Sequence, residues 1–246
     1  MALAHTSRGI DFDTVISGIY RAQCEAKKKF GLESRLIMCF LRDLSAESAA
    51  EHLQMSLHYR DWIAGVRLDS DEQGNPPSKF AKVFSDARKQ GYQLTMHCDV
   101  NQENTLIHIR ECLDLIGVDR IDHGLNALED EQLCADILHR GIGLTICPVS
   151  NRFVVQSLTS EEIRVMLDKG IKVTVNSDDP AYFRAYINEN LMALVEEGDF
   201  TQKEIVQLVT SAFEEIAWLP DDIKAGYLQR LDQYVAGSVM DEDERL

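Results

Sequence analysis

The chain has 246 residues, a formal net charge of -16, 45% apolar residues and 27% charged residues. This length allows a large buried core, and the composition is typical of a globular protein with an acidic surface. The acidic balance argues against duplex nucleic acid and anionic membranes as partners, because both are bound through clustered Lys and Arg.

No stretch approaches the roughly 20 apolar residues that would span a bilayer, and the first residues lack the charged-then-apolar order of a signal peptide. We therefore expect a cytoplasmic protein without a membrane partner. The six cysteines are scattered and form no CxxC pair. This pattern predicts reduced, mostly buried thiols, and neither a disulfide framework nor a Cys-rich zinc site.

Apolar or β-branched runs alternate with helical patterns along the chain. Strands are expected over 34–41, 63–70, 92–99, 120–126, 143–151 and 172–179. Their near-constant spacing matches one strand plus one crossover helix. Helices are expected over 12–31, 45–60, 76–91, 103–117, 130–141 and 160–170, and after them over 187–198, 201–218 and 221–237.

The alternation predicts a parallel sheet with helices outside it, because the strands are too apolar to be solvated on one face. The chain contains no GxGxxG and no GxxxxGK[ST] motif, so a barrel is favoured over an open nucleotide-binding sheet. We predict an α/β fold of the (β/α)8 TIM type, with six of the eight strands that a closed barrel needs and with C-terminal helices. No linker composition interrupts the chain, so residues 1–246 are expected to form a single, incomplete domain.

Polar residues gather at the carboxyl ends of the expected strands, the face on which barrel enzymes keep their sites. They are Asp69, Ser70, Asp71, Glu72, His97, Asp99, Asp122, His123, Ser150, Asn151, Asp178 and Asp179. The histidines and the Asp pair have ordinary structural explanations: a lone His is more often hydrogen-bonded than metal-bound, and Asp-Asp-Pro suits a helix N-terminus. The combination of His and Asp from distant segments nevertheless favours a divalent metal, and imidazole with carboxylate suits zinc.

Two of these residues have a specific alternative explanation. Asp71 and Glu72 lead into the sequence GNPP, which is typical of a solvated turn. The five remaining histidines, expected in loops or on helices, are interpreted as surface or hydrogen-bonded residues: His5, His52, His58, His108 and His139.

Four motifs in this order resemble the adenosine and adenine deaminase family of metal-dependent hydrolases: MHCD at 96–99, RIDHGLN at 120–126, TICPVSN at 145–151 and VTVNSDDPAYF at 173–183. The string GVRLDSDEQGNPPSKF at 65–80 is more similar to the adenine branch than to the nucleoside branch. The resemblance runs from about residue 4 to about residue 235.

The resemblance implies a barrel that binds one Zn2+ ion and replaces the 6-amino group of a purine with oxygen from water. His97 corresponds to a zinc ligand and Asp178 to the carboxylate zinc ligand. His123 corresponds to the residue that holds and polarises the attacking water. Zinc chemistry agrees with these roles, because zinc lowers the pKa of water to about 7.

The family's purine contacts also have counterparts here. Asp179 corresponds to a residue that hydrogen-bonds the purine ring, and Ser70 and Asp71 fall where the family lines the substrate pocket. The expected partner is therefore a small-molecule purine such as adenine or adenosine. A homo-oligomer remains possible.

Two departures from the family pattern stand out. The family's first strand ends in His-x-His and supplies two further zinc ligands, whereas this chain contains no such motif and begins where the family's second strand has ended. The family's general-acid Glu, three residues after the ligand His, is Val100 here, and a valine transfers no proton. Asp99 or Glu103 are candidates to replace it.

Three hypotheses follow. The leading hypothesis is a zinc-dependent purine aminohydrolase whose substrate is adenine or an adenosine-like 6-aminopurine. The second is a catalytically inactive remnant or pseudoenzyme that at most binds a purine or a partner. The third, a metal-dependent hydrolase of amides or phosphoesters, is less favoured because no expected strand ends in the Lys that often bridges two metals in such sites.

Overall fold

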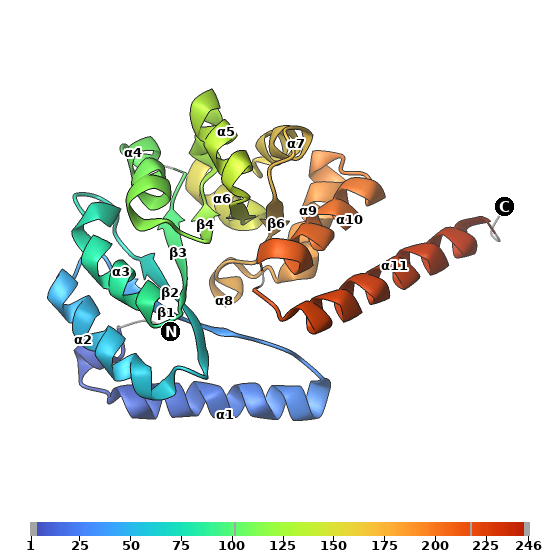
Figure 1. The fold of residues 1–246 in the computed structure, drawn as a ribbon. Coiled ribbons are helices and arrows are strands. Elements are labelled where there is room, and N and C mark those ends of the chain that lie inside the picture. Colours follow the sequence, from blue (N-terminus) through green and yellow to red (C-terminus); the bar gives the residue numbers. More distant parts are fainter. Residues whose placement is uncertain (1–3, 101, 217, 244–246) are drawn as a thin grey trace. The chain divides into compact units, whose positions relative to one another are not determined.

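Strands and helices alternate in the computed structural model, which describes residues 4–100, 102–216 and 218–243. The chain divides into two compact units, Met1–Asp130 and Glu131–Leu246. Each is described by itself below, and Figure 1 follows the order of elements from blue to red.

The first unit is built on four parallel strands. They are β1 (Leu36–Leu41), β2 (Ile63–Asp69), β3 (Gln93–Cys98) and β4 (Arg120–His123), paired in the order β1-β2-β3-β4. The helices are α1 (Phe12–Phe30), α2 (Ala46–Ser56), α3 (Ala81–Lys89) and α4 (Thr105–Glu111). A π-helical turn, Cys112–Ile116, continues α4, and short 3-10 turns occur at Thr6–Arg8, Leu57–Tyr59, Pro77–Phe80 and Leu125–Glu129.

The core of the first unit lies between this sheet and the helices α2, α3 and α4, which contact its strands (Figure 1). Apolar side chains from both layers are 0 to 1% exposed: Met38, Phe40, Val66, Leu68, Phe84, Leu94, Met96, Ile109 and Ile121. The helix ends follow the sequence signals. The Ser45 side chain accepts a hydrogen bond from the backbone N–H of Ser48 at the start of α2, and Gly31 has a φ of 67° at the end of α1.

The second unit contains a parallel pair, β5 (Gly143–Ile146) and β6 (Val173–Val175), whose residues are all buried. Its helices are α5 (Glu131–Arg140), α6 (Pro148–Val155), α7 (Ser160–Asp168), α8 (Pro180–Phe183), α9 (Ile187–Gly198), α10 (Gln202–Ser211) and α11 (Asp221–Asp243), with a π-helical turn at Ala212–Ile216. Thr201 and Glu204 form the capping box that the sequence predicts at the start of α10.

Three of the expected strands are too long. The predicted strand 143–151 ends at Ile146, because Pro148 has the fixed φ that suits the first turn of a helix and α6 begins there. The predicted strand 120–126 ends at His123, since Gly124 turns the chain with a φ of 79°. The predicted strand 172–179 ends at Val175.

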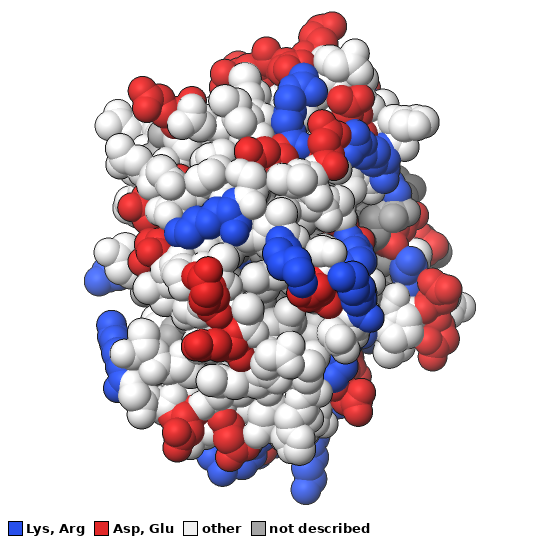
Figure 2. Space-filling view, turned by 60° about the vertical axis from the view of Figure 1, so that its left-hand side comes forward, with Lys and Arg blue, Asp and Glu red and all other residues white. Residues whose placement is uncertain are grey.

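Other expectations on composition can be compared with the structure. All six cysteines are free thiols; Cys24 is exposed and the other five are buried, as predicted. Within the described ranges, we find no helix with the length and apolar character needed to traverse a bilayer. On the face drawn in Figure 2, basic side chains are interspersed with acidic ones.

Candidate functional site

The backbone turns sharply at three of the predicted site residues. Ser70 has a φ of 81°, His123 a φ of 61° and Asp178 a φ of 56°. Residues with a Cβ rarely adopt positive φ, and such strain is retained where the surrounding structure imposes it. Ser70 directly follows β2, His123 is the last residue of β4, and Asp178 lies three residues after β6.

His97 and His123 lie side by side in the first unit. The pairing of β3 with β4 places His97 opposite Asp122 and Cys98 opposite His123. The two imidazole rings have centroids 4.7 Å apart and meet edge to face. His123 is buried, whereas the His97 side chain keeps 17% of its surface exposed. The structure therefore brings together two of the histidines that the sequence analysis singled out.

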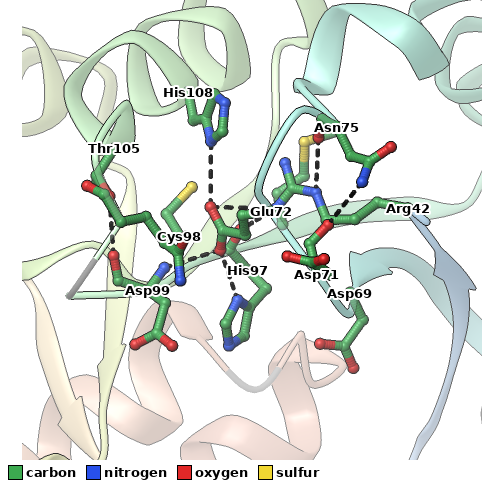
Figure 3. A network of polar contacts seen from close by, with 12 residues as sticks. Arg42, Asp69, Asp71, Glu72, Asn75, His97, Cys98, Asp99, Thr105 and His108 are labelled. Atoms are coloured by element: carbon green, nitrogen blue, oxygen red, sulfur yellow. Dashed lines mark hydrogen bonds and ion pairs between the residues drawn. The ribbon is translucent and has the colours of Figure 1, made fainter. Parts of the chain in front are cut away.

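Glu72 is the centre of a buried network of polar contacts that includes His97 and His108 (Figure 3). Its Oε1 lies 2.7 Å from Nδ1 of His97 and accepts a hydrogen bond of 2.9 Å from the backbone N–H of Asp99. Its Oε2 lies 3.1 Å from Nδ1 of His108 and 3.3 Å from Nη1 of Arg42. The alternative of a solvated turn is thus wrong for Glu72, which is 2% exposed.

These contacts set the protonation of the network. Burial on its own would raise the pKa of Glu72, but the hydrogen bonds from His108 and His97, the charge of Arg42 and the backbone N–H of Asp99 outweigh it and hold the pKa at about 2. Burial likewise acts to lower the pKa of His97, yet the hydrogen bond to Glu72 raises it overall. Glu72 is therefore an ionised carboxylate at neutral pH.

Asp99 and Val100 follow His97 directly. In Figure 3 the Asp99 carboxylate points to the same side of Glu72 as the His97 ring, and His108 lies on the opposite side. One carboxylate oxygen of Asp99 accepts a hydrogen bond of 2.7 Å from the backbone N–H of Val100. Thr105 fixes the turn by donating its hydroxyl to the Asp99 carbonyl at 2.9 Å. Asp99 is thus held next to the predicted ligand.

A cavity of about 550 Å³ opens in the first unit beside this turn. It is lined by Glu72, Gln73, Val100, Gln102, Glu103, Asn104 and His108. Glu103 is the second candidate for the missing general acid. Its side chain is exposed and lines this cavity, and no contact between it and Glu72 is among those described above. Between the two candidates, the geometry favours Asp99.

The predicted substrate residues of the first unit lie in the loop after β2. Ser70 and Asp71 are both exposed. The Asp71 carboxylate accepts a hydrogen bond of 3.0 Å from the backbone N–H of Gln73, as in an Asx turn. The solvated-turn explanation therefore describes Asp71 correctly, although it fails for the next residue.

The second unit carries the predicted carboxylate pair. Asp178 and Asp179 are exposed and lie between β6 and α8. Oδ2 of Asp178 accepts a hydrogen bond of 2.6 Å from the hydroxyl of Ser150, at the start of α6. Asp179 occupies the N-cap position of α8, but its side chain makes no capping hydrogen bond. Asp179 therefore stands at a helix N-terminus without capping it through its side chain.

The donor atoms of the two predicted ligands suit zinc. With Nδ1 of His97 bonded to Glu72, Nε2 is the ring nitrogen left to bind a metal, and no described residue hydrogen-bonds it. With Oδ2 of Asp178 bonded to Ser150, Oδ1 is likewise left. Imidazole nitrogen and carboxylate oxygen are both zinc ligands in proteins, and each is typically fixed by a hydrogen bond on its other atom.

Sequence reasoning missed Arg42, and it did not assign Glu72, His108 or Ser150 the role of holding these ligands, although Glu72 and Ser150 were among the polar residues at the strand ends. One signal was present for the first two. Arg42 directly follows the apolar run of β1, and an arginine at the end of a buried strand requires a buried acceptor. His108 was expected to be a surface or hydrogen-bonded residue; it is buried and hydrogen-bonded.

Comparisons with known proteins agree on one family. The model of the family described as adenosine deaminase matches residues 3–234. An uncharacterized deaminase of Schizosaccharomyces pombe is 48% identical over 233 residues, which are 94% of this chain and 68% of that protein. An adenine deaminase of Zymomonas mobilis is 44% identical over 234 residues, which are 94% of this chain and 68% of that protein.

Solved structures give the same result. The crystal structure of an adenine deaminase from Arthrobacter aurescens has a TM-score of 0.90 at 36% identity and covers 96% of this chain and 72% of that chain. An amidohydrolase from Burkholderia ambifaria with bound Zn has a TM-score of 0.84 at 25% identity, over 95% of this chain and 66% of that chain. The predicted fold, a TIM-type barrel represented by six of its strands, is confirmed by this agreement.

Proposed function

Because this chain belongs to the adenosine deaminase family of purine deaminases, we propose that it catalyses the zinc-dependent hydrolytic deamination of a 6-aminopurine, with adenine as the favoured substrate. In this reaction the bond from C6 to the amino nitrogen breaks, a bond from C6 to a water oxygen forms, and ammonia leaves. The observation that carries the proposal is the pair His97 and His123, with rings 4.7 Å apart and Nδ1 of His97 held by a buried carboxylate.

The zinc ligands that this chain contributes are proposed to be His97, through Nε2, and Asp178, through Oδ1. When bound, a zinc ion supplies Lewis-acid activation of water at neutral pH. The chain contains no His-x-His motif, and a catalytic zinc needs at least three protein ligands. The proposal therefore requires a further donor besides these two.

The chain's own residues would handle the protons of the reaction. His123 is proposed to orient the attacking water and to accept its proton, a role that its neighbouring position beside His97 supports. Asp99 is proposed to replace the family's glutamate and to protonate a ring nitrogen of the purine. Its carboxylate points to the same side as the His97 ring (Figure 3).

Substrate recognition is proposed to involve Asp179, Ser70 and Asp71. Asp179 is exposed directly before α8, and a carboxylate is a group that can accept a hydrogen bond from a purine N–H. Ser70 and Asp71 are exposed in the strained loop that follows β2. A small-molecule purine is the partner that these groups suit.

The second candidate function is a pseudoenzyme that binds a purine without converting it. Val100 favours this candidate, because a valine stands where the family places its proton donor.

The test uses the 246-residue chain purified from zinc-supplemented medium, with zinc per chain measured by elemental analysis and ammonia measured after incubation with adenine. We expect about one zinc per chain and release of ammonia with formation of hypoxanthine. The His97→Ala variant should lose both, while Glu204→Gln, which alters the capping box of α10 and the ion pair with Arg164 in the second unit, should keep both.

Two results would contradict the proposal. A zinc-loaded chain that leaves adenine and other 6-aminopurines unchanged, yet binds adenine, would be the pseudoenzyme. A chain without zinc and without activity would show that its ligands do not suffice alone.

A further inference from the structure

Glu72 contacts four donor groups that come from three separate segments of the chain: the residue after β1, the end of β3 and α4. Its carboxylate meets the side chains of His97, His108 and Arg42 and the backbone N–H of Asp99. The Asp99 amide can only donate a hydrogen bond, and Arg42 is a cation, so the carboxylate accepts from the amide and pairs its negative charge with the guanidinium. An ionised carboxylate has no proton to give, and both histidines must therefore present an N–H at Nδ1.

This arrangement has a consequence for His97. A neutral imidazole carries one proton, so an N–H at Nδ1 leaves Nε2 as a lone pair. Free histidine can place the proton on either nitrogen, but only the form with Nδ1–H has Nε2 ready to bind a metal ion. The contact with Glu72 selects that form.

We propose that Glu72 is a positioning residue of the deaminase site: it holds His97 in the Nδ1–H tautomer and fixes the direction of Nε2 through the buried network with Arg42 and His108. The proposal rests on the proposed function in one respect, that His97 is a metal ligand. The tautomer itself does not depend on any metal.

Glu72 can hold the ring because it is itself held. Arg42 is fully buried and donates from Nε to the Asn75 carbonyl at 2.9 Å and from Nη1 to the His97 carbonyl at 3.0 Å. Lys79 donates to the Arg42 carbonyl at 2.8 Å and to Oδ1 of Asn75 at 2.9 Å. The guanidinium of Arg42 thus hydrogen-bonds both the loop after β2 and the end of β3.

A purely structural ion pair does not explain the distances. Were Glu72 present only to neutralise Arg42, the guanidinium would be its closest partner. The closest partner is instead Nδ1 of His97 at 2.7 Å, while Nη1 of Arg42 lies at 3.3 Å. The Glu72 carboxylate is therefore directed at the His97 imidazole, and the positive charge of Arg42 compensates the negative charge of the carboxylate.

The first experiment measures the tautomer of His97 in the metal-free chain by ¹⁵N NMR of the imidazole nitrogens, at a pH where the ring is neutral. The chain has seven histidines, and the His97 signals are identified by their loss in His97→Gln. We expect the Nδ1–H form. Nε2–H as the main form in the wild type overturns the proposal, whether or not the chain deaminates adenine.

The second experiment compares Glu72→Ala and Glu72→Asp with Glu204→Gln, which removes a hydrogen-bonded carboxylate from the other unit. Zn2+ affinity is measured by competition with a chelator, and melting temperature by circular dichroism. We expect Glu72→Ala to mix the His97 tautomers and to weaken Zn2+ binding about 10- to 100-fold. Glu72→Asp, which keeps the charge, should fall between it and the wild type.

A merely structural role predicts a different pattern. Glu72→Ala would then lower the melting temperature, as Glu204→Gln does, without changing the His97 nitrogen shifts or the Zn2+ affinity, and the proposal would be wrong. If Glu72→Ala does not fold, Glu72→Asp gives the same comparison. If the wild type binds no Zn2+, the proposed function fails. The proposal about Glu72 is then decided by the His97 tautomers measured in the wild type and in Glu72→Asp.

Discussion

At the scale of single residues, the sequence differs from the family pattern at the position of the proton donor. Val100 stands where a proton donor is expected, and Asp99, one residue earlier, has its carboxylate on the His97 side of the network (Figure 3). A general acid must lie within hydrogen-bond reach of the atom that it protonates, so a shift of one residue matters. Whether Asp99 performs this role is open to a direct test.

The Asp99→Asn variant is expected to lower kcat by about 100-fold or more, because an amide cannot donate the proton that general acid catalysis requires. Steady-state kinetics with adenine measure the effect. Val100→Glu in the Asp99→Asn background should recover part of the activity. Asp86→Asn, on the surface of α3, serves as the control and should match the wild type. Wild-type kcat in Asp99→Asn would exclude Asp99 as the acid.

A second prediction at this scale concerns the stability of the metal-free chain in acid. The pKa of Glu72 is held at about 2 in the folded protein, against an ordinary value of 4.5. A carboxyl group with a lowered folded pKa stabilises the protein fully above its unfolded pKa, and this stabilisation is lost as the pH falls toward the folded pKa. The relevant range is therefore between pH 4.5 and pH 2.

Chemical denaturation of the wild type and Glu72→Gln at several pH values measures this effect. The difference between their free energies of unfolding should contain a pH-dependent part of about 3 kcal/mol at pH 6 that shrinks steadily below pH 4.5. A difference that stays constant from pH 6 to pH 3 would show that Glu72 has an ordinary pKa.

At the scale of elements, local signals located the helix ends better than the strand ends. The capping box of Thr201 and Glu204, the N-cap Ser45 and the left-handed Gly31 all coincide with ends of the predicted helices. These signals act within one turn of the chain, so sequence is enough to find them. The fifth strand was predicted to run to residue 151, whereas Pro148 already belongs to α6.

Helix packing in the second unit gives a prediction about a glycine. A Cβ added to Gly198, at the end of α9, would lie 2.9 Å from Cβ of Ser160 at the start of α7 and 3.3 Å from the ring of Phe200. Gly198→Ala is therefore expected to destabilise the chain by about 1–3 kcal/mol through overpacking.

Gly18 in α1 is the matched control, since a Cβ there meets nothing within 4 Å. Gly18→Ala should be neutral or stabilise by about 0.5–1 kcal/mol, because alanine loses less backbone entropy in a helix. Thermal unfolding followed by circular dichroism compares the two variants. Equal melting temperatures would mean that α7 and α9 can move apart without cost.

At the scale of the whole molecule, metal binding should be visible as a gain in stability. A ligand that binds only the folded state at about 100 times its Kd raises the free energy of unfolding by about 2.7 kcal/mol. Zn2+ should therefore raise the melting temperature of the wild type, and a chelator should reverse the change.

The variants His97→Ala and Asp178→Asn should lose most of this Zn2+ response, and Glu204→Gln should keep it. Mg2+ should have little effect, because it prefers oxygen ligands in octahedral geometry to an imidazole nitrogen. A melting temperature that is the same with and without Zn2+ would contradict metal binding by this chain.

The sequence by itself determined the alternation of strands and helices, the barrel class and the position of His97, His123 and Asp178 at strand ends, because hydrophobic period and motif spacing are local properties. Only the tertiary structure decided that Glu72 is buried and which groups it joins. Its partners Arg42, His97 and His108 lie 25 to 36 residues away along the chain. A sequence pattern shows which face a residue occupies but not which distant side chain it meets, and hydrogen bonds across a parallel sheet form only once its strands are paired.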